Sequence, residues 1–462
     1  SAYSHAYDFS EAERWFEEGV RVSPTKVGAL NAVGHHWLEV RNFEAARNCF
    51  ERVLPQNEVP IVTFVRLAEI YLRLRRPAEA LEMAERALKL YGPHEGALLM
   101  RAKVHRQMRQ WNEAEKILRL VVAKSDSDMG ARAAAWYELG AVLDQRGAYD
   151  EAMAAVLQAK SLMNLSAARP LKILRMKQTQ MKEMQKIPEG TVQRWRKFGQ
   201  TELQPERKLA LLCGHARSGT TLLEYVVDSH PDVISSEETS ILHNVAYYPI
   251  GRATSSNSSL VSALDWMSAR TLRQIRADYF RGTESFLAQP IGGRLLLDKN
   301  PANTFDLPPM ARIFPESKFL VALRDPRDVC LSCFMQPVDL LPDTASWLTL
   351  EGTINHFALI MGLWLAWKPC LGDAALEVRY EDLVENLEGT ARRTLDFLGL
   401  SWDERVLRFN EYASTRIVRS PTYTEVTQPI FKSSLGRWKN YQKYFEPYLE
   451  KLAPFLSAFG YQ

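Results

Sequence analysis

Residues 209–230 read LALLCGHARSGTTLLEYVVDSH, and this stretch decides the fold of the second half of the chain. LALLC (209–213) predicts a buried strand, residues 214–219 a glycine-bearing turn, and TTLLEYVVDSH a helix. Backbone N–H groups in such a turn, together with the helix N-terminus, bind anions. The spacing matches the phosphate loop G-x-x-x-x-G-K-[ST], except that Thr220 stands where the lysine is required. We therefore expect the loop to hold an anionic nucleotide group without catalysing phosphoryl transfer, which excludes a kinase or nucleotide hydrolase.

Four further apolar runs predict strands in the same half of the chain. They are DVISS (232–236), RLLLD (294–298), KFLVALR (318–324) and ALEVRY (375–380). Near-continuous apolar strands are typical of a parallel sheet covered by helices on both faces. We therefore predict a P-loop-like α/β domain over residues 208–462.

The first third of the chain repeats itself. Ala12, Ala46, Ala80 and Ala114 follow one another at steps of 34 residues, and Ala152 lies 38 residues further on. Small residues also stand twelve positions before the last four of these, at Gly34, Ala68, Ala102 and Gly140. This period predicts stacked pairs of antiparallel helices and resembles the tetratricopeptide repeat. We assign residues 1–160 to a repeat solenoid and residues 161–207 to a helical connector and linker.

The charge balance argues against a broad basic surface. Lys and Arg total 58 against 55 Asp and Glu, a net charge of +3 over 462 residues. Proteins that bind nucleic acids carry dense basic surfaces. We expect no nucleic-acid partner, and an anion site that is local.

Cysteine usage and hydropathy bear on the compartment. The five cysteines are an odd and sparse set, which favours free thiols in a reducing, cytoplasmic compartment. The longest apolar stretch, residues 357–367, is about half a bilayer span, so no transmembrane helix is expected. The chain begins with Ser1 rather than Met, which leaves a removed leader open.

A second anion-binding element follows the strand predicted at 318–324. Arg324 ends that strand, and Ser332 lies eight residues on, in the first turns of the next helix. Arginine offers a bidentate fork to phosphate, and serine adds a hydroxyl donor. Both side chains are therefore suited to contact a phosphate group.

The loop GHARSGTTLLE (214–224) resembles the 5′-phosphosulfate loop of sulfotransferases that use 3′-phosphoadenylyl sulfate (PAPS), whose product is PAP. The pair Arg324 and Ser332 resembles the element that holds the 3′-phosphate in that family. The resemblance covers about residues 208–462 and implies a metal-free PAPS site. It assigns cofactor contacts to Arg217, Ser218, Gly219, Thr220, Thr221, Arg324 and Ser332.

Further segments resemble the protein-tyrosine sulfotransferase branch and bacterial repeat-bearing relatives. SEETS (236–240) implies Glu238 as catalytic base, and LDKNPANTF (297–305) implies Lys299 as catalytic lysine. EVRYEDL (377–383) implies a cofactor contact by Tyr380. TEVTQPIFKSSLGRW (424–438) resembles the loop on the adenine and phosphate side, with Phe431 and Arg437. In this scheme Glu238 takes the acceptor proton, while Lys299, Arg217 and Thr422 stabilise developing charge.

The sequence departs from the family pattern at two places. Ala216 replaces the usual proline beside the loop arginine, next to an unusual His215. The hydroxyl that stabilises the transition state aligns with Thr422, with Ser420 as the alternative. Cytosolic sulfotransferases use a histidine base, so His215 and His243 are rival candidates for that role.

These features predict an enzyme that moves a sulfuryl group from PAPS to an acceptor hydroxyl, in first place a protein or peptide tyrosine. The alternatives are a glycan, a small phenol or an alcohol as acceptor, or a non-catalytic repeat scaffold that binds PAP. We expect the repeats to bind the acceptor or a partner protein. The sequence leaves open whether the chain forms a homodimer.

Overall fold

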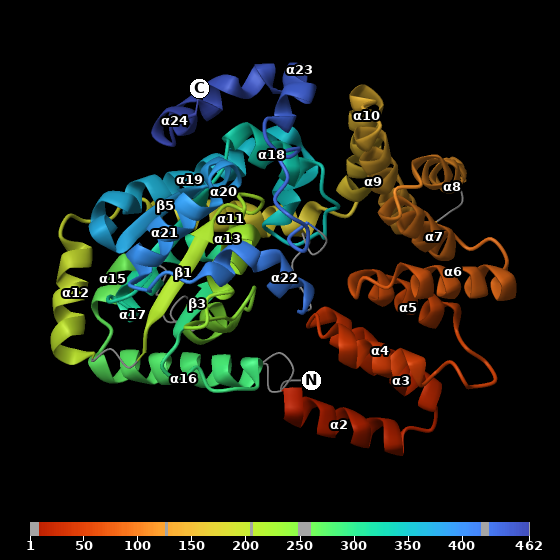
Figure 1. The fold of residues 1–462 in the computed structure, drawn as a ribbon, viewed down its shortest axis with the longest axis horizontal. Helices are drawn as coiled ribbons and strands as arrows, with labels where there is room; N and C mark the ends of the chain where they lie inside the picture. The colour runs from red at the N-terminus through yellow and green to blue at the C-terminus, as the bar shows by residue number, and fades with distance from the viewer. Residues whose placement is uncertain (1–8, 125–127, 204–206, 248–259, 417–424, 462) are drawn as a thin grey trace. The chain divides into compact units, whose positions relative to one another are not determined.

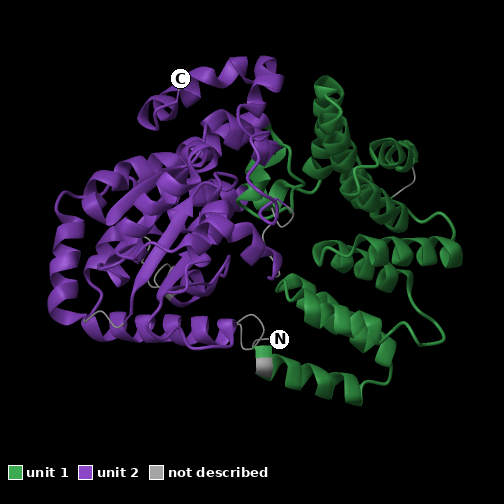
Figure 2. Ribbon diagram, viewed as in Figure 1, with its two compact units in different colours: residues 1–171, 335–349 green, residues 172–334, 350–462 purple. Residues whose placement is uncertain are grey.

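The computed structural model describes residues 9–124, 128–203, 207–247, 260–416 and 425–461. The chain divides into two compact units (Figure 2). Unit 1 holds residues 1–171 and 335–349, and unit 2 holds residues 172–334 and 350–462. The first division falls within the segment predicted as a connector.

Unit 1 is built from helices that pack in sequence-adjacent pairs (Figure 1). The helices are α2 (Phe9–Val22), α3 (Lys26–Glu39), α4 (Phe43–Glu51), α5 (Ile61–Arg73), α6 (Pro77–Tyr91), α7 (Glu95–Gln107), α8 (Trp111–Ala123), α9 (Met129–Gln145) and α10 (Tyr149–Asn164). The pairs are α3–α4, α5–α6, α7–α8 and α9–α10. The predicted helical repeat is confirmed.

Small residues allow the paired helices to approach closely. Ala46, Ala80 and Ala114 are fully buried. A Cβ atom on Gly34 would lie 2.7 Å from Phe50 Cε2, and one on Gly140 would lie 2.8 Å from Val156 Cγ2. Larger side chains at these points would force the helices apart.

The turn inside each repeat uses a left-handed residue. Arg41, Arg75 and Arg109 have φ angles of 56°, 59° and 59°, and Gly147 takes the corresponding position with φ 78°. The sequence did not reveal this recurring left-handed position, because glycine rather than arginine is the residue usually expected in such a conformation.

Unit 1 also contains a segment from much later in the chain. Residues 335–349 end in the 3₁₀ helix η3 (Thr344–Leu348), which packs against α10. Buried Lys160 donates to Gln336 O at 3.3 Å and lies over the Tyr137 ring. This segment, called the strap below, is therefore part of the repeat unit although it follows α18 of unit 2.

Unit 2 is built on a five-stranded parallel sheet with the order β2-β3-β1-β4-β5. The strands are β1 (Leu209–Gly214), β2 (Val233–Ser235), β3 (Leu295–Lys299), β4 (Lys318–Leu323) and β5 (Ala375–Arg379). All five predicted strands are confirmed, because each is a short apolar run bounded by polar or turn residues. Figure 1 shows the sheet surrounded by helices.

The remaining helices belong to unit 2, except that α11 spans the division between the units. They are α11 (Ala168–Met184), α12 (Thr191–Glu202), α13 (Thr220–Asp228), α15 (Leu260–Asp265), α16 (Ala269–Leu287), α17 (Leu307–Ile313), α18 (Pro326–Phe334), α19 (Leu350–Leu371), α20 (Tyr380–Glu385), α21 (Leu387–Leu398), α22 (Phe409–Ser414), α23 (Gln442–Phe445) and α24 (Leu449–Ala458). Short non-α turns include a π-helix (His243–Tyr247) and the 3₁₀ helices η2 (Pro301–Thr304) and η6 (Arg437–Tyr441).

Strand alternation directs neighbouring side chains to opposite faces of the sheet. Leu295 and Leu297 of β3 pack with Leu223 of α13 in one apolar cluster. Asp298 faces the other way and accepts a hydrogen bond from Tyr279 of α16 at 2.7 Å. Lys299, the last residue of β3, therefore returns to the α13 face, at the carboxyl end of the sheet.

Candidate active site

The predicted anion loop connects β1 to α13, as expected. Gly219 has φ 93°, and a Cβ atom there would lie 2.6 Å from Tyr380 Cδ2, so this position requires glycine. Ser218 is 2% exposed, and its Oγ has no hydrogen-bond partner among the described residues. Thr220 and Thr221 are buried in the first turn of α13. An unused buried hydroxyl beside a helix N-terminus is the arrangement that a bound anion would complete.

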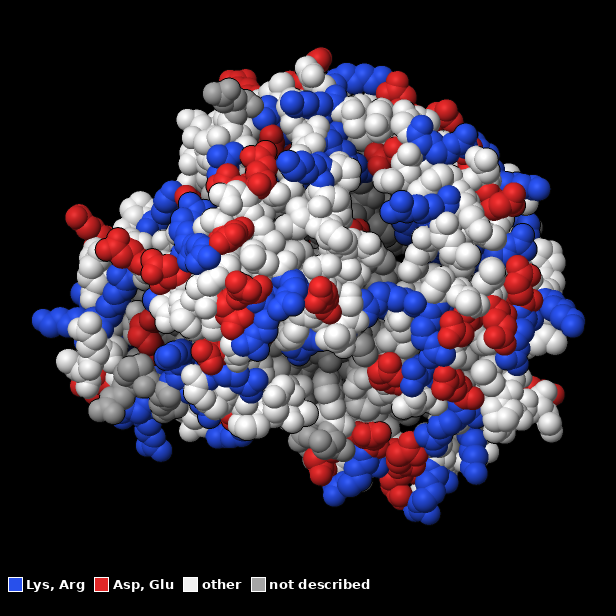
Figure 3. Space-filling view, viewed as in Figure 1, with Lys and Arg blue, Asp and Glu red and all other residues white. Residues whose placement is uncertain are grey.

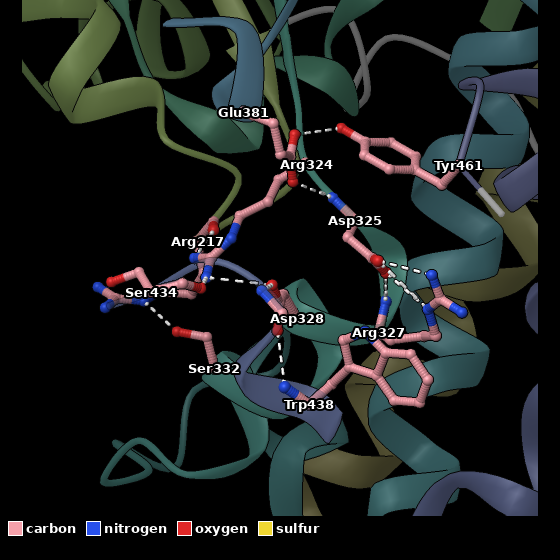
Figure 4. Close-up of polar contacts among 11 residues, drawn as sticks. Arg217, Arg324, Asp325, Arg327, Asp328, Ser332, Glu381, Ser434, Trp438 and Tyr461 are labelled. Carbon is pink, nitrogen blue, oxygen red and sulfur yellow. Dashed lines mark hydrogen bonds and ion pairs between the residues drawn. The ribbon is translucent and has the colours of Figure 1, made fainter. Parts of the chain in front are cut away.

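The two predicted phosphate elements meet in space (Figure 4). Arg217 Nε donates to Ser332 Oγ at 3.0 Å, although 115 residues separate them. Arg324 donates to the backbone oxygens of Arg217 at 3.4 Å and Ser434 at 2.5 Å. The Arg324 guanidinium carbon lies 4.9 Å from the centre of the Tyr380 ring. The structure thus brings Arg217, Arg324, Ser332 and Tyr380 together at the predicted anion loop.

Asp328 of α18 anchors the loop that carries Arg437. Its two carboxylate oxygens accept from the backbone N–H groups of Gly436 and Trp438, each at 2.8 Å (Figure 4). Burial raises the pKa of Asp328, and Arg324 opposes this rise. The loop is therefore held by a carboxylate that lies 3.7 Å from the phosphate-element arginine.

Positive charge is concentrated around the anion loop. Burial lowers the pKa of Arg217, Glu425 opposes this change, and the charges of Arg324 and Arg437 lower the pKa further. Arginines that repel one another in a partly buried site stabilise a bound anion. On the face shown in Figure 3, by contrast, basic and acidic side chains are interspersed. The concentrated charge is local, as the sequence predicted.

A second cluster joins Lys299 to two carboxylates. Lys299 Nζ lies 2.8 Å from Glu238 Oε1 and 3.0 Å from Glu224 Oε2. Lys299 and Glu224 are 1% and 2% exposed, whereas the Glu238 side chain is 21% exposed. Burial alone would lower the pKa of Lys299, but the two carboxylates raise it above its ordinary value. The ammonium therefore stays charged, and the solvent-facing carboxylate of the pair is Glu238.

A chain of hydrogen bonds fixes the turn that carries Glu238. Glu237 N–H donates to Ser235 Oγ at 3.0 Å, and Ser235 Oγ donates to Glu224 Oε1 at 2.6 Å. Glu237 has φ 52°, a left-handed backbone that its side chain disfavours. The turn after β2 is thereby bent so that Glu238 reaches Lys299.

Other candidate residues are not brought into these clusters. Thr422 and Ser420 lie outside the described residues. Phe431 is partly buried before η6, and we find no hydrogen bond, ion pair or ring contact for it among the described parts of the chain. His215 Nδ1 donates to the carbonyl oxygen of Ala216 at 2.8 Å, and burial lowers the pKa of His215 to about 3, which disfavours a role as base. His243 lies 3.3 Å from Asp306.

Sequence reasoning missed three residues of the site: Glu224, Ser235 and Asp328. A signal for Glu224 existed, because Thr220, Glu224 and Asp228 follow at helical spacing on an otherwise apolar helix. Buried carboxylates at such positions require partners, here Lys299 and Ser235. Asp328 lies four residues after Arg324, but its backbone partners are more than 100 residues away and leave no local pattern.

Comparison with known proteins agrees with this geometry. Residues 210–404 match the model of the Sulfotransferase family, and residues 65–128 and 99–162 match the Tetratricopeptide repeat. The chain is thus similar to sulfotransferases over residues 210–404 and to tetratricopeptide repeats over residues 65–162. Among the described residues, no helix is long and apolar enough to cross a bilayer, and no acidic, His or Cys cluster suits a metal.

The curated relatives that this chain resembles include protein-tyrosine sulfotransferases. Protein-tyrosine sulfotransferase 2 of Gallus gallus is 28% identical over 50% of this chain and 63% of its own length. A putative protein-tyrosine sulfotransferase of Caenorhabditis briggsae is 27% identical over 55% of this chain and 89% of its own. An uncharacterized protein of Aquifex aeolicus is 24% identical over 70% of this chain. The chain spans only 41% of that relative's length.

Proposed function

We propose that the chain transfers a sulfuryl group from PAPS to a tyrosine hydroxyl of a protein or peptide, with Glu238 as general base. The observation that carries the proposal is the ion pair of Lys299 with Glu238 at the sheet edge that also bears the anion loop. Ligands of open α/β sheets bind at this carboxyl edge. The tyrosine acceptor is taken from the names of the relatives.

The residues present fit PAPS. Among the described residues, buried Ser218 Oγ and Arg324 Nε have no hydrogen-bond partner, and the charges of Arg324 and Arg437 act on the loop arginine, Arg217. Arg217 and the loop N–H groups would hold the phosphosulfate, while Arg324 and Ser332 would hold the 3′-phosphate. When bound, PAPS supplies an activated sulfuryl group on a phosphate leaving group.

The chain's own residues would supply the rest of the chemistry. Glu238 would accept the acceptor's hydroxyl proton as the new S–O bond forms and the bond to PAP breaks, which contributes about 10²–10⁴-fold. Lys299 and Arg217 would stabilise the negative charge that develops on the sulfuryl and bridging oxygens. Both groups are fixed before reaction, Lys299 by its carboxylates and Arg217 by Ser332.

The experiment is incubation with PAPS and a panel of tyrosine peptides, phenols, alcohols and glycans, scored by mass for one added sulfuryl group. Glu238→Gln should lose turnover and retain PAP binding, whereas the adjacent Glu237→Gln should keep turnover. Transfer to glycans or small phenols alone would replace the acceptor assignment. PAP binding without transfer to any acceptor would identify a scaffold instead of an enzyme. Turnover by Glu238→Gln at the wild-type rate would reject Glu238 as base.

A further inference from the structure

Glu224 is a deeply buried carboxylate that shares Lys299 with the proposed base, and the reaction scheme above gives it no role in the chemistry. It lies one turn into α13, directly after the anion loop. Both of its carboxylate oxygens receive a donor, Oε1 from Ser235 and Oε2 from Lys299. Two donors on two oxygens are the contacts of an ionised carboxylate rather than of a neutral acid.

We propose that Glu224 is a positioning residue that divides the charge of Lys299 between two carboxylates and thereby keeps Glu238 basic. This inference rests on the function proposed above. It assigns to Glu224 no contact with either substrate.

The charge of Lys299 affects how readily Glu238 accepts a proton. If Lys299 faced Glu238 alone, its full charge would stabilise the Glu238 carboxylate and make it a poor proton acceptor. Glu224 places a second negative charge next to the same ammonium. The two carboxylate oxygens lie 2.8 and 3.0 Å from Nζ, so they are at most about 6 Å apart. At an effective dielectric constant of about 20, a charge at ~6 Å shifts a pKa by about two units.

Other charged groups around Glu224 do not replace it. Glu237 adds negative charge from the same turn. Asp228, one turn further along α13, is engaged with Arg416 at 3.3 Å and with the backbone of Ser235. Lys299 is therefore the cation that Glu224 and Glu238 share.

Glu224 also fixes the positions of Lys299 and of the turn that carries Glu238. Glu224 accepts from Ser235, which in turn accepts from Glu237 N–H. One side chain on the cofactor-loop helix thus fixes the lysine of β3 and the turn after β2 that carries the base. Loss of Glu224 would loosen both groups while leaving the anion loop itself in place.

The test is the pH profile of kcat for wild type and Glu224→Gln between pH 5 and 9. Glutamine still accepts from Ser235 but cannot accept from Lys299 through its amide nitrogen. We expect kcat to fall about tenfold or more and its acid limb to move down by about one to two pH units, with the PAP dissociation constant within about twofold of wild type. Asp298→Asn is the matched control, because Asp298 is buried next to Lys299 but faces α16. The acid limb of the kcat profile of Asp298→Asn should stay at its wild-type pH.

Several outcomes would overturn the inference. An unchanged kcat in Glu224→Gln would do so, as would a lower kcat with an unmoved acid limb, which indicates a structural role alone. An equal movement in Asp298→Asn would also reject it. If Glu224→Gln does not fold, Glu224→Asp must move the limb in the same direction by less. If the wild type transfers no sulfuryl group, the proposed function fails, and the role of Glu224 fails with it. If the wild type transfers the group but the acid limb of kcat does not move in Glu224→Gln, only the role of Glu224 fails.

Discussion

Replacement of Lys299 by methionine should produce a stability loss that grows with pH. Methionine resembles the apolar stem of lysine but carries no charge. The change leaves Glu224, 2% exposed, without the cation that lies 3.0 Å away in the wild type. Removal of one partner from a buried ion pair costs about 3–5 kcal/mol. Glu238 contributes less to this loss because its side chain is 21% exposed.

The sign of the pH dependence follows from Glu224. Burial raises its pKa in the wild type even though Lys299 opposes the rise, so the pKa should rise further without Lys299. A carboxyl whose folded pKa lies above its unfolded value contributes stability at low pH and loses it as pH rises toward the folded pKa. The loss reaches about 1.4 kcal/mol per pH unit for one proton. Lys299→Met should therefore be nearer to wild type at pH 5.5 than at pH 8.

Calorimetric unfolding of four proteins measures this effect. Wild type, Lys299→Met, Glu224→Gln and the double variant would be compared at pH 5.5, 7 and 8. At pH 8 the double variant should exceed Lys299→Met in stability by about 2 kcal/mol or more, because it buries no unpaired charge. The reasoning is refuted if Lys299→Met loses the same free energy at every pH, or if the added Glu224→Gln change gives no recovery.

Three further changes test other parts of the structure. Gly219→Ala should abolish the rise in Tm that PAP causes in the wild type, because φ 93° and the close contact described above admit no side chain; an undiminished rise would contradict the loop geometry. Arg75→Gly should stabilise the repeats by about 0.5 kcal/mol in thermal unfolding, whereas Gly147→Ala should destabilise them by about 1 kcal/mol. Lys160→Ala should speed proteolysis within residues 335–349, since Lys160 donates to this strap; an unchanged cleavage pattern would show that the strap is held by other contacts.

The elements that the sequence predicted correctly have local signals. The five strands are contiguous apolar runs, and the repeats are recognisable from small residues that recur at a fixed period. The strap has no such signal, because residues 335–349 read as a connection between two helices. Its partners on α9 and α10 lie more than 170 residues earlier in the chain. Packing between distant segments cannot be inferred from periodicity alone.

The candidate site likewise contains residues that the sequence predicted and residues that it did not. Arg217, Arg324 and Ser332 were predicted from the resemblance of their segments to sulfotransferase motifs, and the structure brings the three residues together. Glu224 was missed because its helical spacing with Thr220 and Asp228 does not show which distant cation the carboxylate pairs with. Only the three-dimensional position of Lys299 shows why a carboxylate is retained in that apolar helix.

Backbone strain links the two halves of the site. Arg217 and Glu237 have φ angles of 70° and 52°, and neither is a glycine. Such residues cost about 1–2 kcal/mol each and persist where the surrounding contacts determine them. The strain at Arg217 accompanies its hydrogen bond to Ser332, and the strain at Glu237 accompanies its bond to Ser235. In both turns, the residue that bears the strain is tied by a serine hydroxyl beside a group proposed to bind or react. A glycine would relax either turn, but it would also remove the loop arginine or free the turn that presents Glu238, so the strain is retained where precise placement of charge is needed.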